Sequence, residues 1–209
     1  MPEQRQKAPD TMDTTPTPDA DVNAIAFDTT RLHLREFQPA DADALAAYWV
    51  LPIHQRFYPE AIDPAADARS LVARLITAQT AKPRHVYQLA ITLHGSPDAI
   101  GTAGVRITRA DLREADIGYE VHPDHWGRGY ASEAARAMLD FAFRDLQMHR
   151  VWAECNAANT GSSNVLRKLG MRREAHFEQS TYARGQWWDE ERYAILDHEW
   201  QALQVQQAE

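Results

Sequence analysis

Two glycines flank an arginine just before a predicted helix, in the segment HPDHWGRGYASEAARAMLDFAF at residues 122–143. Glycine has a poor helix propensity, so Gly127 and Gly129 weaken this helix start. They suit an anion site, however. The first N–H groups of a helix have no internal partner, the aligned peptide dipoles add partial positive charge, and glycine lets a ligand approach the chain closely. Because Arg128 adds a formal charge, the segment predicts a phosphate-binding turn.

The common nucleotide motifs do not fit this turn. A P-loop needs a lysine after its second glycine, and that lysine is missing. The dinucleotide fingerprint Gly-x-Gly-x-x-Gly is also incomplete, because Ser132 stands where its third glycine belongs. The turn moreover follows several strands in a row instead of opening a strand–helix–strand unit. The sequence therefore favours another phosphate-bearing ligand.

Carboxylates on the strands beside this turn are candidates for a catalytic base. Glu120 precedes the turn and shares a strand face with Gly118 and His122, because side chains alternate along a strand. A carboxylate in a partly dry cleft has a raised pKa, which would make Glu120 a better base. Glu154, on the following strand, is the second candidate and His122 the third. An exposed or ion-paired Glu120, and a structural hydrogen bond from Glu154, are the alternatives.

The elements that position these residues follow from periodicity and turn signals. We expect a strand at 31–35, helices at 38–50 and 63–79, strands at 85–93, 99–108 and 114–121, a helix at 130–143, a strand at 149–156, a helix at 160–170, and two final strands around Gly185. Consecutive strands followed by alternating helices predict a mixed α/β sheet with helices on its faces. The crossover through residues 116–155 should be right-handed and parallel.

Composition limits the remaining possibilities. The chain has 209 residues, a net charge of −8 and one cysteine, Cys155. Residues 1–24 have little to bury and predict a disordered tail, and 25–209 predict one domain. An acidic chain has no general attraction for nucleic acid or anionic lipid. Because no secretory signal, membrane span or disulfide pair is present, we expect a cytoplasmic protein. The spacing of its histidines, cysteine and acids predicts no metal site.

Four segments together resemble one family. IGYEVHPDHWGRGYASEA, at residues 117–134, is similar to the acetyl-CoA-binding motif of the GCN5-related N-acetyltransferase (GNAT) superfamily, whose signature is Gln/Arg-x-x-Gly-x-Gly/Ala. Trp126 stands in the first position, and Gly129 and Ala131 in the other two. TTRLHLREFQPADADAL, NTGSSNVLRKLGM and GQWWDEERYAIL resemble motifs of its RimJ/RimL-like branch. The four segments occur in the family's order.

This resemblance implies the GNAT fold, which is a mixed, mostly antiparallel, twisted sheet of six to seven strands with about four helices and a splayed central strand pair. It also implies an acetyl-CoA-dependent N-acetyltransferase in which an amine attacks directly in a ternary complex. The alternative is an inactive acetyl-CoA-binding sensor or interaction module. We expect the acceptor to be a small-molecule amine or a peptide N-terminus, and the protein to be a monomer or a homodimer.

Site residues follow from the same resemblance. Main-chain amides near the turn should hold the coenzyme diphosphate, the pantetheine arm should lie along the strand that ends at Val121, and Asn159 should bind that arm. The implied cofactor-binding residues are Val121, His122, Trp126, Gly127, Arg128, Gly129, Tyr130, Ala131, Ser132, Asn159 and Ser162.

The leaving thiolate and the acceptor need further residues. In many relatives, a tyrosine at the position of Leu166 acts as the general acid for the leaving thiolate. Because this chain has leucine there, Ser162 is expected to take over that role through its hydroxyl. The alternative for Ser162 is a helix N-cap. The aromatic residues Tyr182, Trp187 and Trp188 in the last turn are candidates for binding the acceptor, and packing against the sheet or a dimer partner is their alternative. Because no activating base is identifiable beside Cys155, direct attack is favoured over a cysteine-bound intermediate.

Overall fold

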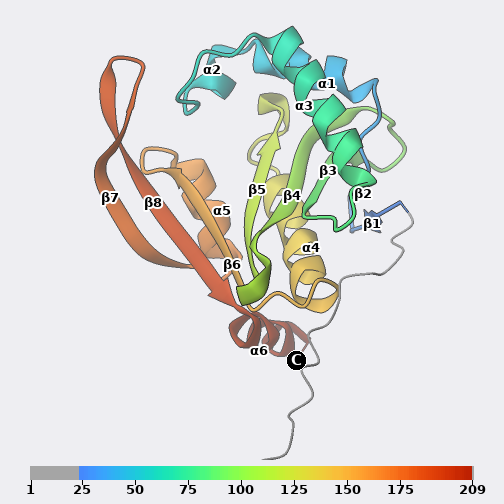
Figure 1. Cartoon of the computed structure of the whole chain (residues 1–209), viewed down its shortest axis with the longest axis vertical. Helices are drawn as coiled ribbons and strands as arrows, with labels where there is room; N and C mark the ends of the chain where they lie inside the picture. Colours follow the sequence, from blue (N-terminus) through green and yellow to red (C-terminus); the bar gives the residue numbers. More distant parts are fainter. Residues whose placement is uncertain (1–23, 209) are drawn as a thin grey trace, which may run out of the picture.

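A computed structural model of the chain describes residues 24–208, and the predicted tail at 1–24 lies almost entirely outside them. Eight strands form one sheet in the order β1-β2-β3-β4-β5-β6-β8-β7 (Figure 1). The strands are β1 (Ala26–Asp28), β2 (Leu32–Arg35), β3 (Val86–Leu93), β4 (Ala99–Arg109), β5 (Glu114–Val121), β6 (Arg150–Asn156), β7 (Arg172–Ala183) and β8 (Gln186–Leu196). All neighbouring strands are antiparallel except β5 and β6.

The parallel pair in the middle of the sheet is splayed, as predicted. β5 and β6 are paired only from Glu114 with Arg150 to Asp116 with Trp152. Beyond Asp116 the two strands separate, while β5 stays paired with β4 as far as Val121. The sheet therefore opens between its two halves at the carboxyl ends of β5 and β6.

Helices cover both faces of the sheet. They are α1 (Asp41–Trp49), α2 (Pro52–Gln55), α3 (Pro64–Gln79), α4 (Tyr130–Arg144), α5 (Thr160–Lys168) and α6 (Asp197–Ala208), with 3-10 turns η1 (Ala110–Leu112) and η2 (Pro123–His125). Ala90 packs with α1 and α3, whereas its neighbours Leu89 and Ile91 belong to the larger core with α4. Because side chains alternate along a strand, α1 and α3 cover the face opposite to α4.

The predicted helix after the glycine turn illustrates how periodicity builds this core. Six apolar positions expected on one face of α4 are all buried: Ala134, Ala135, Met138, Leu139, Phe141 and Ala142. They pack against Leu32, Leu34 and Val105 of the sheet. The α/β class and the mixed sheet are thus confirmed.

The counts of elements differ from the prediction. Three short or terminal elements were not expected, namely β1, α2 and α6. α2 begins at Pro52, in the first helical position, but it has only one turn, which is too short for a periodic pattern. α6 replaces the end of the last predicted strand at Asp197, where Glu199 accepts a hydrogen bond from the main-chain N–H of Leu196 at 2.8 Å. Trp200 then buries its ring and donates to Asp140.

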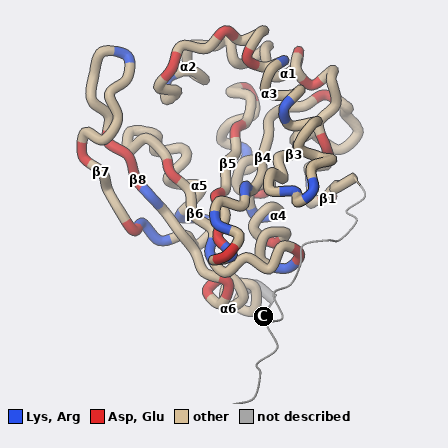
Figure 2. The backbone as a smooth tube through the Cα atoms, in the orientation of Figure 1, with Lys and Arg blue, Asp and Glu red and all other residues tan. Residues whose placement is uncertain are grey.

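Charged residues are interleaved over the second half of the sheet. Figure 2 shows basic and acidic positions close together along β6, β7 and β8. Ion pairs join them, including Arg150–Glu174 at 2.5 Å and Arg192–Glu154 at 2.6 Å. Within residues 24–208, no helix is both long and apolar enough to cross a bilayer.

Candidate active site

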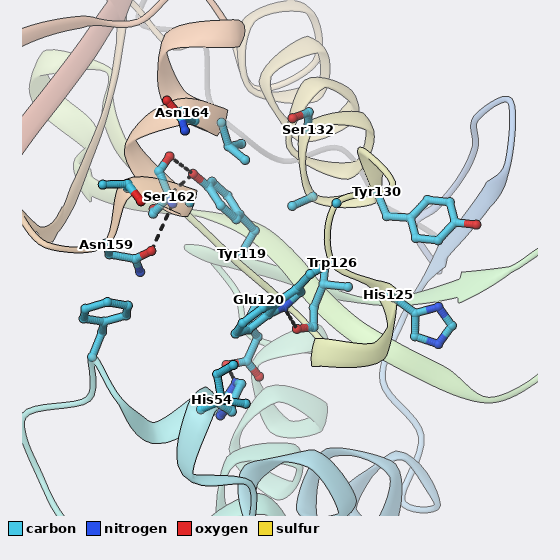
Figure 3. Close-up of a pocket in the computed structure, with 18 of the residues that line it drawn as sticks. His54, Tyr119, Glu120, His125, Trp126, Tyr130, Ser132, Asn159, Ser162 and Asn164 are labelled. Atoms are coloured by element: carbon cyan, nitrogen blue, oxygen red, sulfur yellow. Dashed lines mark hydrogen bonds and ion pairs between the residues drawn. The ribbon is translucent and has the colours of Figure 1, made fainter.

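A cavity of about 520 Å³ lies where β5 and β6 separate (Figure 3). Its walls come from four segments: the stretch from α2 to Tyr58, the end of β5, the glycine turn with the start of α4, and the start of α5. The lining residues include Ile53, His54, Arg56, Phe57, Tyr58, Tyr119, Glu120, Val121, His125, Trp126, Gly127, Gly129, Tyr130, Ala131, Ser132, Asn159, Ser162 and Lys168. The opening in the sheet is therefore also the place where the predicted phosphate-binding turn and the predicted base meet.

The glycine turn has the geometry that glycine permits best. Gly127 and Gly129 have φ angles of 73° and 83°, in the left-handed region that strains other residues. Gly129 is the N-cap of α4, and no side chain within residues 24–208 caps this helix end. The first N–H groups of α4 are consequently available to an anion, and the helix dipole favours one there.

An arginine from the turn between β1 and β2 holds this glycine turn. Arg31 donates from Nη1 to the main-chain oxygen of Arg128 at 2.8 Å and from Nε to Glu133 at 2.7 Å. Glu133 lies in the first turn of α4 and also accepts from Thr29 at 2.6 Å. Burial acts to raise the pKa of Glu133, but hydrogen bonds from Thr29 and Arg31 outweigh it and leave the pKa lowered. We call Thr29, Arg31 and Glu133 the turn clamp.

A hydroxyl pair lies on the opposite side of the cavity. The Tyr119 hydroxyl donates to the Ser162 main-chain oxygen at 3.0 Å and lies 3.2 Å from Ser162 Oγ (Figure 3). Burial raises the pKa of Tyr119, so this hydroxyl stays protonated near neutral pH. The N-cap of α5 is Asn159, which accepts from the Ser162 N–H at 3.1 Å. Ser162 therefore does not cap the helix, and its hydroxyl faces Tyr119.

Glu120 lies at the other end of the cavity inside a cage of hydrogen-bond donors. Oε1 accepts from the Tyr48 hydroxyl at 2.8 Å and from the Trp49 indole at 2.9 Å, and Oε2 accepts from the Tyr58 hydroxyl. His54 Nε2 lies 3.4 Å from Oε2. The carboxylate is 14% exposed and lines the cavity. These donors come from α1, α2 and the loop after α2, which are far from β5 in the sequence.

The hydrogen-bond donors around Glu120 reverse the expected effect of burial on its pKa. Burial alone would raise the pKa of Glu120, but contact with His54 and the hydrogen bonds from Tyr58 and Tyr48 outweigh it, so the pKa is lowered. The predicted raised pKa is wrong for this reason. Glu120 is instead a carboxylate that remains ionised throughout the neutral range.

Residues 31–172, well over half of the chain, match the family model described as an acetyltransferase (GNAT) domain. The chain belongs to the GNAT family. It is an N-acetyltransferase, and the resemblance predicted from the four segments is confirmed.

Named relatives of this GNAT protein agree with the assignment. An uncharacterized N-acetyltransferase, YnaD from Bacillus subtilis (strain 168), is 33% identical over 172 residues, which cover 82% of this chain and 97% of YnaD. A GNAT-family acetyltransferase from Bacillus anthracis is 29% identical with a TM-score of 0.73, covering 83% of this chain and 99% of that one. The ribosomal L7/L12 alpha-N-protein acetyltransferase RimL, solved in complex with coenzyme A, shares the fold at 20% identity and a TM-score of 0.69, covering 81% and 96%.

Most of the predicted cofactor-binding residues of this GNAT domain line the cavity. Two do not. His122 accepts from the main-chain N–H of Asp124 at 3.0 Å and so caps η2, and the exposed Arg128 contributes only its main-chain oxygen, to the turn clamp. Trp126, half-exposed, lines the cavity and also donates from its indole to the last carbonyl of β5, on Val121, at 2.6 Å.

The other candidate side chains lie elsewhere. Glu154 does not line the cavity, because it points to the opposite face of β6 and pairs with Arg192. Of the two interpretations of Glu154, the structure supports the structural one, because Arg192 donates to its carboxylate from Nε at 2.9 Å and from Nη2 at 2.6 Å. Cys155, on the face toward α5, has its pKa raised by burial to about 11, which makes a thiolate nucleophile unfavourable.

The aromatic residues of the β7–β8 hairpin also lie outside the cavity lining. Tyr182 and Trp187 are exposed and pack against each other with ring centroids 5.2 Å apart, whereas Trp188 is buried. The hairpin tip nevertheless contacts the loop after α2, which also carries Tyr58, because Arg184 donates to the main-chain oxygen of Glu60 at 3.3 Å. Figure 1 shows the tip on the same side of the molecule as α2.

Sequence reasoning missed the residues from α2 and its loop, namely His54, Phe57 and Tyr58, and it missed Tyr119. Strand alternation places Tyr119 on the face opposite to Glu120. Both residues line the cavity because β5 has no β6 neighbour at this height. A detectable signal was the density of aromatic residues between Tyr48 and Tyr58.

Proposed function

We propose that this protein moves the acetyl group of acetyl-CoA to a primary amine by direct attack in a ternary complex. The observation that carries the proposal is the shared cavity: an uncapped helix N-terminus behind two left-handed glycines at one wall, and an ionised carboxylate at the other. A Cβ at Gly127 would meet no atom within 4 Å, so the turn leaves open space for a phosphate. These features fit a coenzyme A diphosphate.

The cavity residues divide the work of binding. The N–H groups at the start of α4, with Gly127 and Gly129, would hold the diphosphate. The unpaired stretch of β5 after Asp116 would take an extended pantetheine arm as an added strand, with Asn159 on its other side. When bound, acetyl-CoA supplies the thioester whose carbonyl carbon is attacked and whose C–S bond breaks. Lys168, which also lines the cavity, adds positive charge for phosphate groups.

Glu120 would bind and deprotonate the amine. At pH 7 an α-amine costs only about 1–1.4 kcal/mol to deprotonate, against roughly 4–5 kcal/mol for a lysine-like amine. A carboxylate with a lowered pKa is a weak base, so it suits the first kind of amine better. On the thiolate side, Ser162 would donate its hydroxyl to the leaving sulfur, with Tyr119 beside it as a protonated partner.

The charges of the cavity restrict the acceptor. Glu120 is the sole carboxylate among the described residues that line it, and Arg56 and Lys168 are cations of the same lining. One relative is named spermidine N(1)-acetyltransferase, from Escherichia coli (strain K12), at 26% identity over 43% of this chain. A polyamine carries several positive charges that one carboxylate does not balance. We therefore propose an acceptor with one amine, either a peptide N-terminus or a small monoamine.

A thiol-release assay tests the proposal. Purified protein is given acetyl-CoA with peptides bearing free N-termini, small monoamines and spermidine, and the products are identified by mass spectrometry. We expect thiol release and an acetylated amine with at least one monoamine or peptide, and a lower kcat/KM for spermidine. Tight coenzyme binding without thiol release from any amine would instead favour a sensor or interaction module.

A further inference from the structure

His54 is a buried imidazole whose hydrogen-bonding capacity is unused. Its side chain is 4% exposed, and neither ring nitrogen has a hydrogen-bond partner among the described residues. Buried polar atoms are nearly always hydrogen-bonded, so an unpartnered histidine at a cavity wall requires an explanation. No periodic pattern selects His54, because α2 is a single helical turn.

The ring is held in a fixed position by aromatic neighbours. It meets the edge of Tyr48 with centroids 4.8 Å apart, stacks on Trp49 at 6.4 Å, and lies 5.1 Å from Tyr58. The ring nitrogen that faces the carboxylate, Nε2, is 3.4 Å from Glu120 Oε2. This distance is longer than a good hydrogen bond but short enough to close by a small movement.

Among the described residues that pack against His54, Glu120 is the one carboxylate, and it lies within reach of His54 Nε2 for a proton transfer. Burial raises the pKa of Tyr48 and of Tyr58 well above the usual range, and contact with Glu120 raises both further. Trp49 has an indole N–H that does not titrate. Arg56, the cation nearest in sequence, faces Phe57, with its guanidinium 5.1 Å from the ring centroid.

We infer that His54 and Glu120 form a proton-holding pair, in which Glu120 accepts a proton from the acceptor amine and His54 stores it. This inference rests on the proposed acetyl transfer. The N–H bond of the ammonium breaks, the proton passes through Glu120 Oε2 to His54 Nε2, and the nitrogen lone pair is freed for attack. Acetylation of an ammonium releases one net proton besides the one that the thiolate takes, and the pair returns that proton to water after the products leave.

The pair explains how a weakly basic carboxylate can serve the reaction. Glu120 alone would hold a proton poorly, because its donors stabilise the charged form. Imidazole is a common proton acceptor in enzyme sites, and His54 is the imidazole whose Nε2 faces the Glu120 carboxylate at 3.4 Å. Since His54 acts through Glu120, it is a positioning residue for the proton and does not touch the substrate.

The test compares wild type with His54→Gln and His54→Asn, which can still hydrogen-bond but cannot titrate. His198→Gln is the matched control, because His198 is exposed and its one ion-pair partner among the described residues is its neighbour Asp197, at 3.4 Å. The measurement is kcat at saturating substrates from pH 5 to 9, with two acceptors whose amine pKa values differ. If the pH at which kcat falls differs between the two acceptors, the titrating group is on the substrate. If that pH is the same for both acceptors, the titrating group is on the protein.

We expect an acid limb that does not move with the acceptor in wild type and in the control. In both His54 variants we expect the plateau of kcat to fall about tenfold or more and the limb to move to lower pH, with KM for acetyl-CoA unchanged. An acid limb at the same pH in the His54 variants, or full activity in His54→Gln, would overturn the inference. Either result would mean that His54 only fills space, because glutamine and asparagine cannot take up a proton.

A second measurement does not depend on turnover. The pKa of Glu120, followed by carbon NMR of glutamate-labelled protein, should rise in His54→Gln because the charge of His54 is lost. An unchanged pKa would show that the two groups are uncoupled and would overturn the pair. Coupling without thiol release from any amine would leave the pair intact and contradict the proposed function, so the two failures are distinguishable.

Discussion

The two walls of the cavity are built from different parts of the chain. The wall formed by the glycine turn presents main-chain N–H groups. The side chains of the turn clamp support this turn from the side away from the cavity. The wall formed by Glu120 presents side chains, with donors recruited from α1, α2 and the following loop. A wall of main-chain groups depends on backbone angles, whereas a wall of side chains depends on residue identity.

This difference teaches how one scaffold can keep its coenzyme and change its acceptor. Substitutions in the side-chain wall alter charge and shape around the amine without moving the glycine turn. Substitutions in the main-chain wall matter chiefly where they change φ angles or the turn clamp. Kinetic measurements should therefore distinguish the two walls. Substitutions in the side-chain wall should change kcat and the KM for the amine, whereas substitutions in the main-chain wall should change the affinity for coenzyme A.

Glu120→Gln should show the largest effect, on the side-chain wall alone. Removing the proposed base should lower kcat by about a hundredfold or more, since general base catalysis contributes 10²–10⁴. Coenzyme A affinity, measured by calorimetry, should stay within about twofold. A matching loss of coenzyme affinity would mean that the two walls are not separable.

Gly129→Val tests the main-chain wall. A branched side chain at a φ of 83° costs about 1–3 kcal/mol, so the binding conformation becomes rarer and the Kd for coenzyme A should rise roughly ten- to a hundredfold. Gly95→Val is the matched control, because Gly95 has a φ of 81° and open space around it but lies in the turn after β3. Equal losses of coenzyme affinity in both variants would point to general destabilisation.

Tyr58→Phe weakens the cage without removing the carboxylate. Loss of a hydrogen bond to a charged group should lower the free energy of unfolding by about 1.5 kcal/mol at pH 7. Because the pKa of Glu120 is lowered in the folded protein, this stabilisation is present above the ordinary glutamate pKa and is lost as pH falls through the folded value.

The Tyr58→Phe measurement is urea unfolding of both proteins at pH 7 and at acid pH. The difference between wild type and variant should shrink toward acid pH. A difference that does not change with pH would show that Tyr58 stabilises the fold through packing and not through the ionised carboxylate.

Arg31→Ala should show the smallest effect, because the clamp side chain is 45% exposed. We expect the Kd for coenzyme A to rise about five- to tenfold with little change in kcat, since only the turn loses support. Arg144→Ala removes a comparable surface pair with Asp140 on the same helix, at 3.0 Å, and should leave the Kd unchanged. An unaltered Kd in Arg31→Ala would show that the turn holds its shape without the clamp.

Prediction from the sequence succeeded where local pattern decides structure. The period of α4 identified its buried face, and Gly127 and Gly129 identified a turn that needs left-handed angles. It failed where distant segments meet. The direction of the Glu120 pKa depends on Tyr48 and Tyr58, which are 72 and 62 residues away, and no local pattern reports such neighbours.

The sequence could not decide between the two interpretations of Glu154, for a related reason. Alternation along β6 correctly separates Glu154 from Cys155, but it does not say which face borders the cavity. That depends on where α5 packs and on the pairing of β6 with β8, whose Arg192 takes the Glu154 carboxylate. The four-residue α2 was missed because one helical turn has too few positions for a period to be read.

The separation of β5 from β6 has a consequence for solubility. Unpaired strand edges at the rim of a sheet invite other chains to join, and proteins commonly guard against such aggregation. Here the unpaired stretch of β5 lies in the middle of the sheet, between β4 on one side and α5 on the other. Unpaired main-chain groups in the interior of the sheet can bind a narrow, extended ligand but leave no room for the strand of another protein. The β5 edge can therefore remain available for binding without promoting aggregation.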